Sequence, residues 1–487
     1  MAGRRILQIS AEVDTLARTG GLGDVSLGLS RALAARGEDV VLVTPLYGNT
    51  KVPPGARFWS HPIHPRVGWG RDDVRTSGVL EANLHGVRVL MVANDGLFGG
   101  RSGIYGDKRG TFGDNELRFA AMSAAALEIA DAAFGRPPDV LHAHDWHAAL
   151  SVIYARTRRG AAWSRVPSVF SIHNIAYQGV LGFESLDRLG VPRDLYHPEV
   201  LEAAGAANLL KGACALASRI STVSPAYARE ILSEPNAFGL AGFLRARANK
   251  LIGIVNGIDT SLWDPKTDRA LVHAFDVGSV TEGKGTNKAA LFAEVGLWDS
   301  SAPLFACVSR FTWQKGIDLA LSVVPALVEQ GARILFLGTG EGAIESGVRE
   351  MAARYPGRVA ARIAFDDALA RRIYAGADFI MVPSRFEPCG LTQLYAMRYG
   401  AAPIVTDVGG LHDTVEPYDA VREVGVGFVA RNFDPLDLLL ACEEALAAYG
   451  DRVGLHSLRT RAMTRDHSWT HAAGVYDELL YGPLTAR

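Results

Sequence analysis

The stretch RILQISAEVDTLARTGGLGDVSLGLSRALAARGEDVVLVT, residues 5–44, decides the fold class. Residues 5–10 form a short apolar run typical of a buried strand, and residues 25–35 carry apolar side chains at helical spacing. The glycine-rich segment 19–24 separates them, and residues 40–44 read as the next strand. A strand–loop–helix–strand unit of this kind begins a parallel sheet, so the chain is expected to be an α/β protein.

The same alternation continues along the chain and then starts again in the second half. Two doubly wound, Rossmann-like domains in tandem are the simplest interpretation, and ligands of such folds bind where the strand C-termini face a cleft. The polar, turn-rich stretch 256–285 predicts the boundary, which gives domains at 1–255 and 256–460. Further strands are predicted at residues 87–93, 140–142, 169–173, 219–223, 304–309, 333–337, 359–363, 379–382 and 402–406.

Composition excludes several classes of protein. The 487 residues are 48% hydrophobic and 21% charged, with a formal net charge of −2, which argues against disorder and against a nucleic-acid or anionic-membrane partner. Four scattered cysteines rule out a disulfide scaffold and favour a reducing compartment. Since no signal-peptide pattern and no apolar run of about 20 residues occurs, the expected location is the cytoplasm.

The glycine segment TGGLGD, residues 19–24, is the first motif with chemical meaning. Its glycines let the backbone approach a ligand, and the N-terminus of the following helix offers N–H groups suited to phosphate. The spacing is neither G-x-G-x-x-G nor that of a P-loop. A tight turn without a ligand explains the segment equally well.

Two polar motifs follow predicted strands of the first half, HAHDWH at 142–147 and SIHNIAYQG at 171–179. His142 and His144 would share a strand face, which makes a zinc site conceivable, but no further ligands cluster with them. Histidines hydrogen-bonded within the fold are therefore the favoured interpretation there. The second motif suits a hydroxyl-rich ligand or an ordinary polar loop.

Two motifs of the second half carry charge at strand ends. In SRFTWQKG, residues 309–316, Arg310 and Lys315 would neutralise a diphosphate leaving group, or would be two solvated cations. In PSRFEPCGLTQ, residues 383–393, Glu387 could hold sugar hydroxyls, and a helix beginning near Leu391 could take a phosphate. Cys389 has no paired base and is interpreted as a small loop residue.

In sequence, the chain resembles the bacterial glycogen synthases and plant starch synthases, one family of retaining glycosyltransferases. The resemblance covers nearly the whole chain in order. The blocks that carry it are TGGLGDV, PDVLHAHDWHA, SIHNIAYQG, NLLKGACALASRISTVSPAYAREI, GIVNGID, NKAALFAEVGL, VSRFTWQKGIDL, LGTGEGAIE and PSRFEPCGLTQLYAMRYG.

This resemblance implies a GT-B fold, with a C-terminal segment at 461–487 whose helix, at residues 468–480, packs back on the first domain. The implied reaction transfers glucose from ADP-glucose to the non-reducing end of an α-1,4-glucan such as glycogen, with retention of configuration. No cofactor and no metal are implied, because cationic side chains and helix N-termini carry the diphosphate. A homo-oligomer is compatible with this assignment.

The resemblance also implies roles for residues that match the family's motifs. The catalytic set is Glu387, Arg310, Lys315, Asp145 and His173, the last through its backbone carbonyl at the anomeric carbon. The substrate-binding set is Arg18, Gly20, Gly21, Tyr105, Asn174, Asn256, Phe365, Cys389, Gly390, Leu391 and Thr392.

The chain departs from the family pattern at three places. Arg18 replaces a lysine, Asp14 lies where the family has alanine, and Phe365 replaces a tyrosine under the base. A second carboxylate is missing, since Tyr395 stands eight residues after Glu387, so a front-face substitution fits better than a carboxylate pair.

Three alternatives remain open. The donor could be UDP-glucose, or the chain could be an inactive glucan-binding relative, although that would predict loss of Arg310, Lys315 or Glu387. A nicotinamide oxidoreductase would require a different glycine spacing in the first loop.

Overall fold

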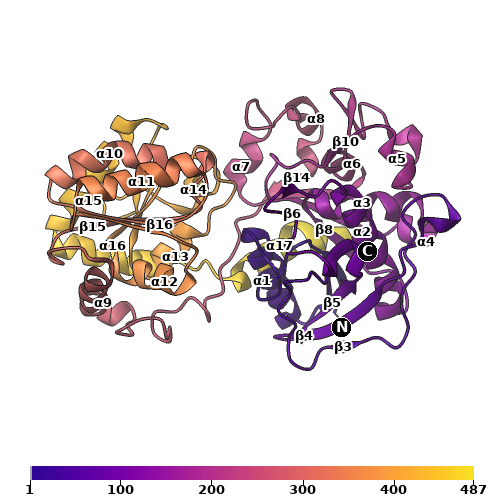
Figure 1. Cartoon of the computed structure of the whole chain (residues 1–487), viewed down its shortest axis with the longest axis horizontal. Coiled ribbons are helices and arrows are strands. Elements are labelled where there is room, and N and C mark those ends of the chain that lie inside the picture. The colour runs from indigo at the N-terminus through magenta and orange to yellow at the C-terminus, as the bar shows by residue number, and fades with distance from the viewer. Residues whose placement is uncertain (1–2, 487) are drawn as a thin grey trace. The chain divides into compact units, whose positions relative to one another are not determined.

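The computed structural model describes residues 3–486, which form two units, each built around its own sheet (Figure 1). Both units alternate strands and helices around a largely parallel sheet, which confirms the predicted pair of doubly wound domains. The first unit holds residues 3–223, 228–257 and 469–486, and the second holds 224–227 and 258–468.

The sheet of the first unit has nine strands in the order β14-β13-β9-β8-β1-β2-β5-β4-β3. Ile6, Leu7 and Ile9 of the central strand are fully buried, as expected for a parallel strand covered on both faces. The parallel strands are β1 (Arg5–Ile9), β2 (Asp39–Pro45), β5 (Val87–Ala93), β8 (Val140–His144), β9 (Ser168–Ile172), β13 (Arg219–Thr222) and β14 (Leu251–Gly253).

Two antiparallel strands at one edge of this sheet were not predicted. β4 (Gly78–Leu84) pairs with β5 through the two-residue turn His85–Gly86, and β3 (Arg57–Phe58) pairs with β4. Both turn residues have positive φ, at 54° and 93°, which is the conformation of a tight hairpin turn. The hairpin extends the sheet without a helical crossover.

The helices of the first unit are α1 (Gly21–Ala35), α2 (Asn115–Phe134), α3 (Asp145–Thr157), α4 (Gly160–Ser164), α5 (Ser185–Arg188), α6 (Leu209–Leu216), α8 (Ala241–Arg245), α17 (Trp469–Tyr476) and α18 (Gly482–Thr485). α7 (Pro225–Glu230) spans a change from one unit to the other. Two small antiparallel sheets are formed by β10 (Val180–Leu181), β12 (Ala206–Asn208) and β11 (Glu202–Ala203), and by β6 (Gly106–Asp107) and β7 (Gly110–Thr111).

The C-terminal segment belongs to the first unit. In Figure 1 the yellow helix α17 lies against the indigo helix α1, far from it in sequence. Gly28 of α1 allows this contact, because a Cβ at that position would lie 2.1 Å from Nε1 of Trp469. Trp469 and Tyr476 are thereby buried in the same core as Ile6.

The second unit has a six-stranded parallel sheet in the order β17-β16-β15-β18-β19-β20. Alternate residues of β15 belong to different cores, with Phe305 in one and Leu304 in the other, so both faces of the sheet are covered. The strands are β15 (Leu304–Val308), β16 (Arg333–Gly338), β17 (Val359–Ile363), β18 (Phe379–Val382), β19 (Ala402–Thr406) and β20 (Phe428–Ala430). The helices are α9 (Val280–Val295), α10 (Ile317–Glu329), α11 (Gly342–Arg354), α12 (Asp367–Gly376), α13 (Thr392–Arg398), α14 (Gly409–Thr414), α15 (Pro435–Gly450) and α16 (Arg452–Thr464).

Several predicted boundaries differ from the structure. The long segment of the second unit begins after Gly257. The predicted domain boundary, after residue 255, lies two residues earlier. The C-terminal segment joins the first unit at Trp469 and not at residue 461, because α16 continues to Thr464 and buries Met463 in a core of the second unit. α1 begins at Gly21 and not at residue 25, so most of the glycine segment is its first turn. Among residues 3–486 no helix has the length and hydropathy needed to cross a bilayer.

Candidate active site

A lysine and a glutamate of the second unit meet at the C-terminal ends of two neighbouring strands. Lys315 lies in the 3-10 turn Trp313–Lys315 that follows β15, and Glu387 lies in the loop after β18. The Lys315 Nζ donates to Oε2 of Glu387 at 2.5 Å, and the Ser384 hydroxyl donates to the same oxygen at 2.9 Å. Glu387 is buried, and the hydrogen bonds from these two partners fix the position of its carboxylate.

A glycine makes this meeting sterically feasible. Gly316 has a φ of +63°, and a Cβ on it would lie 1.8 Å from the carbonyl oxygen of Pro383. The two loops consequently touch through their backbones beside the ion pair. Only a residue without a side chain fits both the left-handed conformation and the contact.

Arg310 is the exposed cation of the site. It follows β15 directly, and within residues 3–486 no carboxylate forms an ion pair with its guanidinium. An unpaired, hydrated guanidinium and a paired lysine that follow the same strand are groups suited to a ligand with two phosphates.

The loop between Glu387 and α13 is ordered by one glutamine. Nε2 of Gln393 donates to the carbonyls of Cys389 and Gly390, each at 3.0 Å, and Gly390 has a φ of +75°. The N-cap residue Leu391 then leads into α13, whose first residue is Thr392. Burial of Cys389 fits its interpretation as a loop residue.

Phe365 carries the most exposed aromatic ring among the described residues. It follows β17, in a sheet position next to β16, and its side chain is 79% exposed. An exposed phenyl ring offers a flat apolar face on which a nucleobase can stack.

In the first unit, Glu12 organises the glycine segment. Its buried carboxylate accepts hydrogen bonds from the backbone N–H of Thr19 at 2.7 Å and of Gly20 at 3.0 Å. The Tyr105 hydroxyl donates to the same carboxylate at 2.7 Å. These N–H groups are therefore already bonded to the protein, and Gly21 is the first residue of α1.

Asp145 and His173 form a second group in the first unit. The backbone N–H of His173 donates to Oδ1 of Asp145 at 2.8 Å, so the carboxylate holds the loop that leaves β9. Asp145 is the first residue of α3 and has a φ of +56°, a conformation that costs about 1 kcal/mol or more outside glycine. Burial raises the pKa of Asp145 to about 7 and lowers that of His173 to about 3.

His142 and His144 of the HAHDWH motif are buried partners in hydrogen bonds. His142 bonds to the hydroxyls of Tyr481 and Ser171, at 2.7 and 2.6 Å, and His144 bonds to Gln8 and His173, at 2.9 and 3.0 Å. All four ring nitrogens are thus occupied by protein groups. Within the described part of the chain, no three histidine, cysteine or acidic side chains are grouped as metal ligands.

Asn174 lies in the same loop as His173, and its backbone also hydrogen-bonds to Asp145, whereas Arg18 and Asn256 lie outside these two groups. Arg18 pairs with Asp24 at 2.9 Å and with Asp14 at 3.3 Å, and Oδ1 of Asn174 accepts from the N–H of Ala176. Asn256 is buried, and among residues 3–486 its Oδ1 has no hydrogen-bond partner.

The structure therefore brings together one predicted group in each unit. In the second unit these are Lys315 and Glu387, with Arg310 following the same strand as the lysine. In the first unit Asp145 contacts His173, while Tyr105 is linked to the glycine segment through Glu12. Glu12 was not predicted, although a charged residue three positions after a buried strand was a usable signal.

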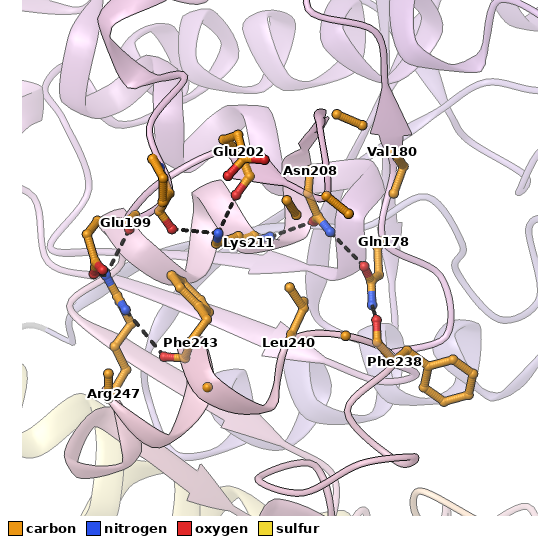
Figure 2. Close-up of a pocket in the computed structure, with 17 residues that line it drawn as sticks. Gln178, Val180, Glu199, Glu202, Asn208, Lys211, Phe238, Leu240, Phe243 and Arg247 are labelled. Atoms are coloured by element: carbon orange, nitrogen blue, oxygen red, sulfur yellow. Dashed lines mark hydrogen bonds and ion pairs between the residues drawn. The ribbon is translucent and has the colours of Figure 1, made fainter.

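Figure 2 shows a different pocket of the first unit, with a volume of about 510 Å³. None of the predicted site residues is among its described lining residues. Its charged groups are already bonded to the protein, since Lys211 donates to the carbonyl of Pro198 at 2.6 Å and Arg247 pairs with Glu199 at 3.0 Å. Gln178, from the predicted SIHNIAYQG motif, accepts from Asn208 at its edge.

Two tandem doubly wound units, one of which presents cations and a buried carboxylate at its strand ends, define a glycosyltransferase of the GT-B type. A model of the starch synthase catalytic domain matches residues 5–246, and a model of glycosyl transferases group 1 matches residues 302–448. The chain belongs to the family of bacterial glycogen synthases and plant starch synthases, as the following relatives establish.

Relatives match along nearly their full length. The glycogen synthase 2 of Agrobacterium fabrum is 41% identical over 97% of this chain and 91% of its own, and the glycogen synthase of an Anaeromyxobacter species is 41% identical over 99% of both. The catalytic domain of starch synthase IV from Arabidopsis thaliana, bound to ADP and acarbose, covers 100% of both chains with 30% identity and a TM-score of 0.91. A sucrose-phosphate synthase from Thermosynechococcus elongatus, 18% identical with a TM-score of 0.62, shares the fold.

Proposed function

We propose that this chain is a glycogen synthase that transfers glucose from ADP-glucose to the non-reducing end of an α-1,4-glucan and retains the anomeric configuration. The observation that carries the proposal is the buried Glu387 carboxylate held by Lys315, with Arg310 unpaired on the same strand end within the described residues. A hydrated guanidinium and an ammonium are suited to a diphosphate, and a buried carboxylate is suited to sugar hydroxyls.

The reaction follows from charge. The bond between the anomeric carbon and the phosphate oxygen breaks, and Arg310 and Lys315 stabilise the negative charge that develops on the departing ADP. The 4-hydroxyl of the acceptor forms the new bond on the same face, and its proton passes to the departing phosphate oxygen. No second carboxylate acts as nucleophile in this proposal.

The candidate residues of the first unit would act on the sugar through carbonyl, amide and hydroxyl dipoles. The loop of His173 is held by Asp145 through its backbone N–H, so the His173 carbonyl is positioned to stabilise positive charge at the anomeric carbon. The unpartnered Oδ1 of the buried Asn256 is an acceptor that a glucose hydroxyl could satisfy. Tyr105, fixed by Glu12, would contribute to the same surface.

The roles of the remaining residues rest on exposure and backbone geometry. Phe365 would stack under the adenine, and the Cys389–Thr392 segment would contact the transferred glucose and a phosphate. No metal and no cofactor take part in this proposal, since side-chain cations carry the diphosphate. We expect the enzyme to work in the cytoplasm on soluble glucan.

The test is transfer of labelled glucose onto glycogen, with ADP-glucose and UDP-glucose compared side by side in the presence of EDTA. Incorporation from ADP-glucose that EDTA leaves unchanged is expected. Preference for UDP-glucose would move the donor assignment, and the altered first loop with Arg18 and Asp14 would be the place to look. Incorporation from neither donor would make an inactive glucan-binding relative the better proposal.

A further inference from the structure

A buried chain of hydrogen bonds crosses three neighbouring strands of the first unit and ends at His173. Gln8 lies on β1, His144 on β8, and His173 follows β9, and these strands are adjacent in the sheet. Oε1 of Gln8 is 2.9 Å from Nε2 of His144, and Nδ1 of His144 is 3.0 Å from Nε2 of His173. Gln8 and His144 are fully buried.

The hydrogen-bond chain has a direction, because Gln8 presents its carbonyl oxygen to His144. Oε1 of Gln8 accepts a hydrogen bond, so His144 carries its proton on Nε2 and its Nδ1 is an acceptor. His173 must then donate from Nε2, which leaves its Nδ1 unprotonated. Burial lowers the pKa of both rings far below 7, so both are neutral in the cell.

Each end of this chain is defined by what surrounds it. Nε2 of Gln8 has no partner among the described residues, so the hydrogen bond between its Oε1 and His144 is the contact that holds the amide there. In the same described part, Nδ1 of His173 has no protein partner and is not sealed from solvent. The free acceptor therefore lies on the loop whose backbone Asp145 holds.

We propose that Gln8 and His144 are positioning residues that hold His173 in a single ring tautomer and thereby fix the loop carrying its backbone carbonyl. The proposal rests on the proposed function, in which that carbonyl meets the anomeric carbon. Neither Gln8 nor His144 touches substrate in this account; each acts through His173.

His142 supplies a matched control within the same strand. It is as buried as His144, and its ring lies 4.2 Å from that of His144, but it bonds to Tyr481 and Ser171 and not to His173. A substitution at His142 therefore removes similar packing without breaking the hydrogen bonds that link Gln8, His144 and His173.

The experiment compares His144→Leu, His144→Asn and His142→Leu in the full-length enzyme. Asparagine keeps an acceptor near the place of Nδ1, whereas leucine has nearly the same shape without one. We expect His144→Leu to lower kcat about 100-fold, the effect of a misplacement of about 1 Å, with the KM for ADP-glucose within about 3-fold of wild type. His144→Asn should recover to within about 5-fold of wild type, and His142→Leu should keep kcat within about 5-fold while lowering Tm as much as His144→Leu does.

A second readout does not depend on activity. Ring-¹⁵N-histidine labelling, with the His173 signals identified by their loss in His173→Gln, should show one protonated Nε2 in the wild type and a mixture of tautomers in His144→Leu. An unchanged tautomer in His144→Leu, or equal kcat losses in the two leucine variants, would overturn the proposal. The wild type could show a single tautomer that is lost in His144→Leu and yet transfer no glucose. That result would support the positioning role and would refute only the proposed function.

Discussion

The candidate residues of the two units differ in how they handle charge. At Asp145 and His173 of the first unit, burial opposes charge, since it raises the pKa of Asp145 to about 7 and lowers that of His173 to about 3. In the second unit Lys315 pairs with Glu387, and Arg310 is exposed to solvent. Under the proposed function, the cations of the second unit would hold the charge of the leaving group, and the candidate residues of the first unit would act on the sugar through fixed dipoles.

Removing the paired cation of the second unit should have the largest effect. Lys315→Ala leaves Glu387 buried without its ammonium partner and removes a cation from the diphosphate, so kcat/KM for ADP-glucose should fall about 1,000-fold or more. Arg422→Ala is the control, because its side chain is 80% exposed in the same unit. Full activity in Lys315→Ala would contradict the division of charge between the units.

Acid should destabilise the first unit through its buried histidines. Burial lowers the pKa of His142, His147 and His173 from 6.5 to about 3. Below pH 6.5 these histidines are therefore protonated in the unfolded chain but remain unprotonated in the folded unit. Stability is therefore lost as the pH falls from about 6.5 toward 3. Asp145 acts in the opposite direction, because its raised pKa adds stability as the pH falls from about 7 to 3.8.

Three groups outweigh one, so Tm should fall by at least about 5 °C between pH 7 and pH 5. Calorimetry of the wild type and of Asp145→Asn checks this, since the variant lacks the opposing carboxyl and should lose stability more steeply. A Tm that stays constant from pH 7 to pH 5 would show that the pKa values of these histidines are not lowered in the folded unit.

The backbone contact that unites the loops of the second unit can be broken with one methyl group. Gly316→Ala places a Cβ in the left-handed region and 1.8 Å from the Pro383 carbonyl, so the turn carrying Lys315 must move away from Glu387. We expect a stability loss of about 2 kcal/mol and a fall in kcat/KM of about 30-fold. Gly342→Ala is the control, because no described atom lies within 4 Å of its Cβ; equal behaviour of the two variants would contradict the role of the contact.

The exposed ring of Phe365 tests whether base stacking belongs to the second unit. Phe365→Ala should weaken ADP binding about 10-fold, since stacking of a base on an aromatic ring contributes about 1–3 kcal/mol, and Phe365→Tyr should bind as wild type. Titration of each variant with ADP measures this. Equal ADP affinity in the alanine variant would remove Phe365 from the site.

The sequence predicted what depends on neighbours along the chain. The apolar run of residues 304–309 gave β15, and the polar residues after it, Arg310 and Lys315, were correctly placed at a strand end. The contact between Lys315 and Glu387 could not be predicted from the sequence, because it depends on β15 and β18 being adjacent in the sheet. Strand order is a property of the fold and not of either motif.

The same limit explains what was missed in the first unit. Glu12 was not among the predicted residues, and only the folded loop shows that its carboxylate accepts hydrogen bonds from the N–H groups of Thr19 and Gly20. The tie between His144 and His173 depends on the register of β8 and β9. Such contacts arise between distant residues, so periodicity and spacing carry no trace of them.

The smallest effect is expected at Arg18, whose substitution tests whether a cation of the first unit also binds the diphosphate. Arg18 is the one predicted cation of the first unit's site, but it is turned to Asp14 and Asp24, and its side chain is 31% exposed. A surface pair of this kind contributes about 0–1 kcal/mol, so Arg18→Lys should change the KM for ADP-glucose less than about 2-fold. Arg18→Ala should change it by less than about 3-fold, because the charge is already neutralised by two carboxylates. A loss of 10-fold or more in Arg18→Ala, measured against UDP-glucose as well, would mean that the guanidinium leaves its carboxylates for the diphosphate, and the first unit would then share the work assigned above to Arg310 and Lys315.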